Sequence, residues 1–380
     1  MPTKKLTTPV CLVATGSSVH DIRHRTGFLA LDPVLYVQAR GEHHLVLPSL
    51  EIGRAGLEAP ATRLWNATDL TGGKARGLGD QAVAILRKLR IRRVRAPGFF
   101  PMEVARALDQ AGIRVDLARE AITPERVVKT SAEAARIADS QRAAARACRH
   151  AMDRIQATRI GRGGRLLDPG SGRPLTSEGL RREVEIRLLQ EGYALPDGCI
   201  VAGGAQAADP HHRGQGPLNA GETIVIDIFP RHQGHGYWGD ITRTVVRGEP
   251  TPTQAAMVRA VRGAQKLALG RIRAGISAAT IHRAVADHLA EAGFPPGEHE
   301  GKPTGFFHGT GHGLGLEIHE APRLGARPVR LRAGMVVTVE PGLYHPEHGG
   351  VRIEDTVLVT RTGCRVLARC PYAWAFRDPQ

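Results

Sequence analysis

The chain has 380 residues, enough for about two domains, and a hydrophobic content of 42% that supports real cores. No stretch approaches the roughly 20 apolar residues that a membrane-spanning helix needs. The net charge of +15 raises nucleic-acid binding, but the arginines are dispersed and only 4% of the residues are aromatic, which leaves few stacking surfaces for bases. We therefore expect a protein that acts neither on nucleic acid nor in a membrane.

The first apolar run, residues 10–14 (VCLVA), is shorter than the roughly 7–15 residues of a signal-peptide core and lacks a convincing cleavage site. It fits a first β-strand, and we expect a cytoplasmic protein. The five cysteines are odd in number and scattered, with no Cys-x-x-Cys pair. They predict neither a disulfide framework nor a zinc–thiolate site.

The first third of the chain alternates short β-like runs with helical ones, which is typical of a compact α/β domain. We place this domain at residues 1–125. The β-like runs lie at 10–15, 33–38 and 43–48, and the helical runs at 80–90 and 102–112 are followed by strand-like stretches at 91–96 and 113–118.

A long helix is predicted next. Thr130 and Glu133 form a T-x-x-E capping box ahead of an alanine-rich stretch with helical periodicity. We expect a long helical connection over residues 126–160. The Gly/Pro/Arg-rich segment 161–174 predicts a loop, and helix returns at 177–192.

From about residue 197 the pattern changes to β-hairpins that bracket two helices, within an α+β domain at 161–380. Thr251 and Gln254 form a second capping box, with Pro252 at the first helical position. The remaining boundary signals are Gly275 at the end of this helix, Ser277 as the N-cap of the next helix, and Gly293 at its end. We interpret both helices as scaffold.

The stretch Phe306–Pro322 (FFHGTGHGLGLEIHEAP) carries three histidines and four glycines at alternate positions. Each glycine costs a helix about 1 kcal/mol relative to Ala, so the spacing favours an extended chain in which His308 and His312 share one face. The glycines would let another backbone, a ligand or an ion approach closely. A glycine-rich loop with incidental histidines is the alternative.

Four carboxylates stand in β-like apolar runs: Asp227, Asp240, Glu340 and Glu354. A carboxylate among Val and Ile is costly unless it is paired or binds a metal. Any one of them fits a strand-end charge or an ion pair, but four beside a histidine in one segment predict a site. Such an oxygen-rich set with one imidazole selects Mn²⁺, Co²⁺, Fe²⁺ or Zn²⁺, and five ligands suit two metals that activate a bridging water for hydrolysis.

The ordered motifs D-x12-D, H-G-x-G-H-x-x-G…H, V-E-P-G and R-I-E-D resemble the dinuclear pita-bread metallopeptidases, which include Xaa-Pro aminopeptidases and prolidases. Residues 20–37 (HDIRHRTGFLALDPVLYV) resemble the opening of the creatinase/prolidase-type N-terminal domain. The resemblance implies an α/β N-terminal domain followed by an α+β pita-bread catalytic domain.

The resemblance also implies a role for each matched residue. Asp227 would bind one metal, Asp240 and Glu354 would bridge both, and His312 and Glu340 would complete the second. Glu340 would also relay the proton of the bridging water.

Further residues would surround the metals. His319 would stabilise the tetrahedral intermediate, His308 would form the site wall, and Arg352 would hold the carboxylates. An upstream family histidine matches His211, with His212 as the neighbouring possibility.

One departure concerns the loop between Asp227 and Asp240, which is two residues longer than is usual in the family and holds His232 and His235. The extension would be a hairpin able to reshape the substrate pocket. We interpret its histidines as loop residues, and likewise His345 and His348.

The implied activity is hydrolysis of Xaa-Pro bonds in proline-containing dipeptides or short peptides, by a dipeptidase or an aminopeptidase. Two divalent ions per chain are implied, Mn²⁺, Co²⁺ or Zn²⁺, with Mn²⁺ favoured, and family analogy implies a homodimer. The alternatives are a creatinase-like or other amide hydrolase of the same fold, and a catalytically inactive pita-bread binding module.

Overall fold

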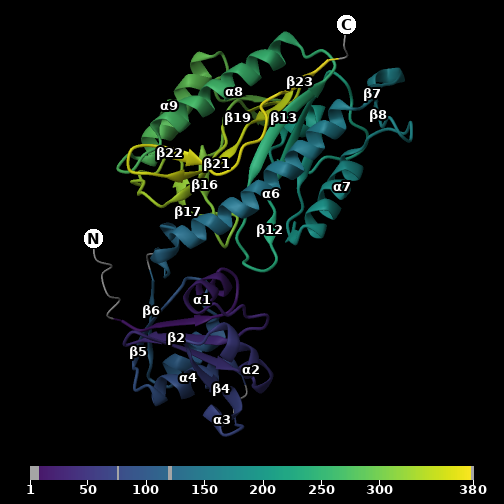
Figure 1. The fold of residues 1–380 in the computed structure, drawn as a ribbon. Helices are drawn as coiled ribbons and strands as arrows, with labels where there is room; N and C mark the ends of the chain where they lie inside the picture. Colours follow the sequence, from purple (N-terminus) through teal and green to yellow (C-terminus); the bar gives the residue numbers. More distant parts are fainter. Residues whose placement is uncertain (1–7, 75–76, 119–121, 378–380) are drawn as a thin grey trace. The chain divides into compact units, whose positions relative to one another are not determined.

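The computed structural model describes residues 8–74, 77–118 and 122–377 (Figure 1). The chain divides into two compact units, Met1–Arg126 and Val127–Gln380. None of the described helices is both long enough and apolar enough to span a membrane.

The first unit is a six-stranded mixed sheet, in the order β4-β3-β2-β1-β5-β6, with helices on both faces. β1, β2 and β3 pair antiparallel, whereas β4, β5 and β6 join in parallel. The elements are β1 (Val10–Val13), α1 (Ser18–Thr26), β2 (Leu35–Ala39), β3 (Glu42–Leu47), α2 (Ser49–Glu58), β4 (Arg63–Asn66), α3 (Ala67–Thr71), α4 (Leu78–Lys88), β5 (Arg93–Ala96), α5 (Met102–Gln110) and β6 (Arg114–Leu117). The predicted α/β alternation is confirmed.

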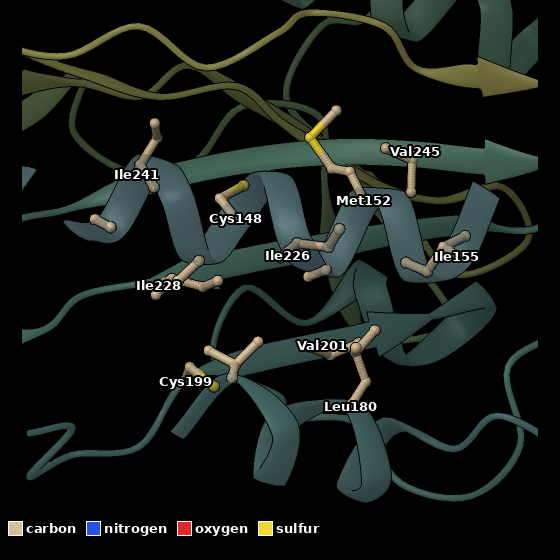
Figure 2. Close-up of a cluster of buried hydrophobic side chains, with 14 of the residues drawn as sticks. Cys148, Met152, Ile155, Leu180, Cys199, Val201, Ile226, Ile228, Ile241 and Val245 are labelled. Carbon is tan, nitrogen blue, oxygen red and sulfur yellow. The ribbon is translucent and has the colours of Figure 1, made fainter. Parts of the chain in front are cut away.

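The long predicted helix is α6 (Ser131–Gln156), and its capping box is present in both directions. The Thr130 side chain accepts from the Glu133 N–H, and the Glu133 carboxylate accepts from the Thr130 N–H. A good N-cap is worth about 1 kcal/mol. The buried face of α6 packs on β11 and β13 within the second unit, so this helix belongs to the core of that unit (Figure 2).

The first half of the second unit is an antiparallel sheet, β10-β11-β13, that β23 extends in parallel, with α6 and α7 packed against it (Figures 1 and 2). Its strands are almost wholly buried, which explains their continuous apolar runs. The elements are α7 (Ser177–Gln190), β10 (Ile200–Gly203), β11 (Thr223–Ile228), β13 (Ile241–Arg247) and β23 (Ala375–Phe376), with short pairs β7 (Arg159–Ile160) with β8 (Leu166–Leu167) and β9 (Tyr193–Ala194) with β12 (Arg231–His232).

The second half repeats the plan, with α8 and α9 packed on the sheet β17-β16-β18-β21-β22. The Thr251–Gln254 capping box is confirmed. The helix ends before Gly275, because Ile272 already has an extended conformation. Ser277 is the N-cap of α9, although its side chain makes no capping hydrogen bond. The elements are α8 (Pro252–Arg271), α9 (Ala278–Glu291), β14 (Gly297–His299), β15 (Lys302–Thr304), β16 (Gly311–Gly313), β17 (Glu320–Leu324), β18 (Val336–Val339), β19 (Gly342–His345), β20 (Gly349–Arg352), β21 (Asp355–Val359) and β22 (Cys364–Val366).

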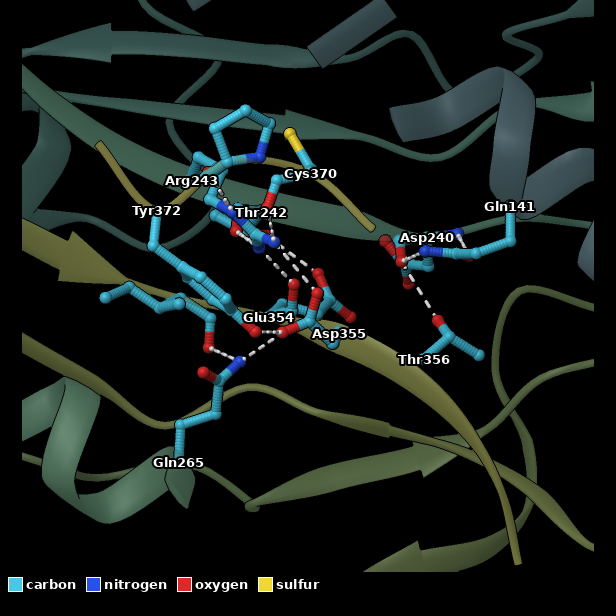
Figure 3. A network of polar contacts seen from close by, with 12 residues as sticks. Gln141, Asp240, Thr242, Arg243, Gln265, Glu354, Asp355, Thr356, Cys370 and Tyr372 are labelled. Atoms are coloured by element: carbon cyan, nitrogen blue, oxygen red, sulfur yellow. Dashed lines mark hydrogen bonds and ion pairs between the residues drawn. The ribbon is translucent and has the colours of Figure 1, made fainter. Parts of the chain in front are cut away.

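The two halves of the second unit each pack helices on a largely antiparallel sheet, as expected for the pita-bread fold. A buried arginine ties them together (Figure 3). Arg243 of β13 donates to Asp355 of β21 at 2.9 Å, and Gln265 of α8 and Tyr372 also donate to that carboxylate. Because Arg243 and Asp355 are both buried, loss of either one would leave the charge of the other unpaired. The network therefore joins β13 of one sheet to β21 of the other, beside the site described next.

Candidate active site

A cavity of about 1260 Å³ opens in the second unit, lined from both halves. Its lining includes every residue that the sequence singled out for the site: His211, His212, Asp227, Asp240, His308, His312, His319, Glu340, Arg352 and Glu354. The polar groups are therefore brought together from segments that lie far apart in the chain.

The two aspartates come from neighbouring antiparallel strands. Asp227 lies in β11 opposite Thr242 of β13, and Asp240 stands just before β13, two residues from Thr242 and on the same side. Gln141 of α6 holds the Asp240 main chain, donating to its carbonyl and accepting from its N–H, both at 2.7 Å (Figure 3). Both aspartates are buried.

Glu354 sits between β20 and β21 and is only 2% exposed. Its N–H donates to the Thr242 carbonyl, and the Thr242 hydroxyl donates to its Oε2 at 2.8 Å (Figure 3). Thr242 thus orients Glu354 from the strand that follows Asp240. The sequence reasoning missed Thr242, although its place two residues after Asp240 puts it on the same strand face.

His312 lies in β16 with its ring orientation fixed. Its Nδ1–H donates to the Gly313 carbonyl at 3.1 Å, since a carbonyl oxygen only accepts. The Nε2 lone pair is left 3.5 Å from Asp240 Oδ2 and 3.4 Å from Glu340 Oε1. Burial, together with the neighbouring His319, lowers the pKa of His312 to about 3, so its imidazole is neutral. A ring fixed in this way is typical of a metal-binding histidine.

The glycines beside His312 make room for neighbouring backbones. A Cβ at Gly311 would overlap the Thr338 carbonyl of β18, and one at Gly313 would overlap the Ala321 carbonyl of β17. The sequence left open whether a backbone, a ligand or an ion approaches these glycines. At Gly311 and Gly313 it is a neighbouring backbone. His308 lies in the loop before β16, outside the strand.

The carboxylates are crowded and incompletely satisfied. Among the described residues, Asp227 Oδ1 and Glu354 Oε1 are buried without a hydrogen-bond partner. Burial and neighbouring carboxylates raise the pKa values of Asp240 and Glu354 well above their usual range, and burial raises the pKa of Glu340 to about 7. Asp240, His312 and Glu354 each offer a ligand atom, all within 4.8 Å of one another. This donor set fits divalent cations.

A hydrogen-bonded chain runs along one wall of the cavity. Arg352 donates to the Tyr344 hydroxyl at 3.0 Å, and Nε2 of His308 lies 3.0 Å from the same hydroxyl. Nδ1 of His308 donates to the Gly309 carbonyl, so Nε2 must accept from Tyr344. The other end of Arg352 donates to Asp227 at 2.7 Å. Nothing in the sequence pattern pointed to Tyr344, which lies within β19 and belongs to none of the recognised motifs.

The outer histidines stand at the more exposed part of the cavity. His319 is exposed, and its ring packs edge-on against that of His312 with centroids 4.3 Å apart. His211 is exposed and His212 half-buried, and the Nδ1 of His212 accepts from the Gly214 N–H. Both histidines line the cavity, and His212 also holds the backbone of Gly214 through this hydrogen bond.

The longer loop between the aspartates folds away from the cavity. Its residues Arg231–His232 form β12, which pairs with β9, and of this loop Phe229 is the residue that lines the cavity. His232 and His235 stack on each other near Asp139 of α6. The predicted hairpin extension is present, but it contributes little to the cavity wall.

The profile of metallopeptidase family M24 matches residues 135–361. The chain is 32% identical over 255 residues to the uncharacterized peptidase YqhT of Bacillus subtilis, covering 66% of this chain and 65% of that protein. It is 38% identical over 190 residues to an Xaa-Pro dipeptidase of Pyrococcus horikoshii, covering 49% and 51%.

The matches therefore span about two thirds of the first relative and half of the second. Among solved structures, the prolidase from Pyrococcus furiosus superposes with a TM-score of 0.78 at 25% identity, over 96% of this chain and 97% of that chain. With the profile matching more than half of its length, the chain belongs to metallopeptidase family M24.

Proposed function

We propose that this protein is a metal-dependent exopeptidase that hydrolyses Xaa-Pro bonds. The observation that carries the proposal is the buried Nε2 lone pair of His312, which faces Asp240 and Glu340 while Nδ1 is held by a carbonyl. Buried carboxylate oxygens of Asp227 and Glu354 without hydrogen-bond partners complete the set. These atoms need cations to offset their burial.

Asp227, Asp240, His312, Glu340 and Glu354 would hold two divalent ions. Four carboxylates and one imidazole favour Mn²⁺, while Co²⁺ and Zn²⁺ also accept such ligands. When bound, paired cations make a water nucleophilic near neutral pH and polarise the carbonyl under attack.

The chain's own groups would position the substrate and move protons. Glu340 lines the cavity beside His312, and its carboxylate would take up and return the proton of the attacking water. His319, which is exposed and lines the cavity, would donate to the oxygen or amide of the scissile bond. Arg352 holds Asp227 in place, and His308 is fixed on the wall by Tyr344.

A cation on the cavity wall favours substrates that end in a carboxylate. Arg323 of β17 is paired in register with His312, is exposed and lines the cavity. A dipeptide would bring its terminal carboxylate within reach of such a group. We therefore propose Xaa-Pro dipeptides as the first substrate class, with longer Xaa-Pro peptides as the alternative. The similarity to an Xaa-Pro dipeptidase supports the choice of proline.

The test is a peptidase panel on metal-defined protein. The wild type, loaded with Mn²⁺, Co²⁺ or Zn²⁺, should release proline from Ala-Pro and Gly-Pro far faster than it cleaves Ala-Ala. The Asp240→Asn variant should lose both metal and activity, whereas Asp153→Asn, an exposed change on α6, should keep both. Absence of cleavage of both dipeptides and Xaa-Pro-Yaa peptides with all three metals would overturn the proposal.

A creatinase-like amide hydrolase is separated by the same preparation. Turnover of creatine by metal-free protein, without turnover of any Xaa-Pro peptide, would favour that reading. Intact metal binding without hydrolysis of any of these substrates would favour a binding module.

A further inference from the structure

Three imidazoles and one carboxylate gather where two hairpins meet, outside the carboxylate cluster. His299 ends β14 and His345 ends β19, while Glu347 and His348 lie in the turn between β19 and β20. His345, Glu347 and His348 each offer a ligand atom, all within 4.8 Å of one another. His299 Nε2 lies 3.7 Å from Glu347 Oε1, and its ring centroid is 4.9 Å from that of His345.

We propose that His299, His345, Glu347 and His348 bind one further divalent transition-metal ion, with Zn²⁺ as the best-matched cation. Three nitrogens and one oxygen form a four-coordinate set of the kind that Zn²⁺ takes. The cavity offers mainly oxygen ligands, so the two places differ in the metals they favour. The proposal does not depend on the peptidase activity.

The two hairpins are held together by the backbone, which keeps the four side chains near one another. Gly305 and Tyr344 exchange main-chain hydrogen bonds of 3.0 and 3.3 Å, joining the segment after β15 to β19. All four side chains are half-buried or exposed, so small rotations can close the site around an ion. The Nδ1 of His345 accepts only a long hydrogen bond, 3.3 Å from the Glu347 N–H, which is inexpensive to release.

A second histidine cluster, Asp139 with His232 and His235, is less suitable. Its two rings are nearly parallel, at 10°, with centroids 3.9 Å apart, so their in-plane lone pairs do not converge on one ion. The Nδ1 of His232 already accepts from two backbone N–H groups. The rings of His345 and His348 lie farther apart, at 4.7 Å and 24°, and His299 adds a third direction. The His232 pair therefore serves as a control.

A metal here would join two parts of the cavity wall. Pro346 in the β19–β20 turn and Lys302 and Pro303 in β15 all line the cavity. An ion shared by the two hairpins would hold these wall residues together and restrict their motion.

The experiment counts zinc in untagged protein. Metal-free protein is dialysed against about 10 µM Zn²⁺ and its zinc content measured by mass spectrometry. The His345→Ala/His348→Ala double variant should hold one zinc per chain fewer than the wild type, whatever the cavity itself binds. The His232→Ala/His235→Ala variant should match the wild type. Equal zinc in wild type and the first double variant, or a loss confined to the control, would overturn the proposal.

Hydrogen exchange provides a readout that does not use activity. Zn²⁺ should slow amide exchange in residues 297–304 and 345–349 of the wild type and of Asp240→Asn, which tests this site apart from the cavity. The effect should be absent in His348→Gln, a conservative change at the exposed turn. Unchanged exchange in these two segments of the wild type would also overturn the proposal.

Discussion

The Nε2 atom of His312 lies 3.4 Å from Oε1 of Glu340, and the other ring nitrogen of His312 donates to the Gly313 carbonyl. Thr338 connects the two residues as well, because its hydroxyl accepts from the His312 N–H and lies 3.3 Å from Glu340 Oε1. A lone pair and an ionised carboxylate that face each other repel unless a proton or a metal cation lies between them. The relationship explains why a buried imidazole with so low a pKa stands here.

Replacing His312 with Gln should remove the one nitrogen ligand of the proposed metal site. With less metal bound, the negative charge of the carboxylates would be only partly compensated. We expect fewer than two metal ions per chain and a fall in kcat/KM of at least about 100-fold on Xaa-Pro dipeptides. Metal analysis and steady-state kinetics measure both. His150→Gln, on α6 and outside the cavity lining, should leave metal content and kinetics unchanged. Full metal occupancy in His312→Gln would refute the assignment.

Tyr344→Phe should break the chain between Arg352 and His308 without changing the shape of the cavity. A buried hydrogen bond is worth roughly 1 kcal/mol, so kcat should fall several-fold while metal content stays the same. The pH profile of kcat should also change, because Nε2 of His308 loses the hydroxyl that it accepts from. If neither the pH profile nor kcat changes, the hydrogen bonds of the Tyr344 hydroxyl have a structural role only.

Arg323→Ala should impair substrates with a free carboxylate. Loss of a charge-assisted hydrogen bond costs about 1.5–3 kcal/mol, so KM for Ala-Pro should rise roughly 10- to 100-fold. The amide-capped Ala-Pro substrate should change little, and Arg323→Lys should restore part of the affinity. Arg327→Ala, an exposed change outside the cavity lining, is the matched control. Equal effects on the free and capped substrates would argue against carboxylate recognition.

Metal-free protein should lose stability as the pH rises from 6.5 to 8. Asp240, Glu340 and Glu354 have higher pKa values in the folded protein than in the unfolded chain. They therefore stabilise the fold at low pH, and this stabilisation is lost as the pH rises through the folded-state pKa values, about 7 for Glu340. His308 and His312 act in the opposite sense, but with pKa values lowered to about 4 and 3 their contribution is complete above about pH 6.5.

Thermal unfolding at several pH values measures this dependence. In a unit of this size each kcal/mol lost lowers Tm by roughly 2–4 °C. Metal-loaded protein should show a much flatter profile, since bound carboxylates are already deprotonated. If the Tm of the metal-free protein rises between pH 6.5 and 8, the buried carboxylates do not govern its stability in this range.

Gly311→Ala should destabilise the fold beside the site. The added Cβ would overlap the Thr338 carbonyl in the neighbouring strand, and overpacking of this kind costs about 1–3 kcal/mol or more. Gly363→Ala, where a Cβ meets nothing within 4 Å, is the matched control and should change the free energy of unfolding by less than about 1 kcal/mol. Chemical denaturation compares the two. Equal stability of both variants would show that β16 and β18 can separate without cost.

Local pattern was sufficient for the parts of this protein that short-range physics governs. The capping boxes at Thr130 and Thr251 start α6 and α8 because the cap and its partner lie three residues apart. Apolar runs interrupted by a carboxylate likewise marked the strands that approach the cavity, since an acid there requires a partner.

Relations between distant segments depended on the tertiary structure. Tyr344 meets His308 and Arg352 only because β19 and β20 pair beside the loop before β16. Gln141 reaches Asp240 from a helix 99 residues away in sequence. The ring orientation of His312, the backbones packed on Gly311, and the gathering of His299 with the β19–β20 turn follow from the same packing. Hydrogen-bond geometry and close contact act over a few ångströms in space, and spacing along the chain does not report them.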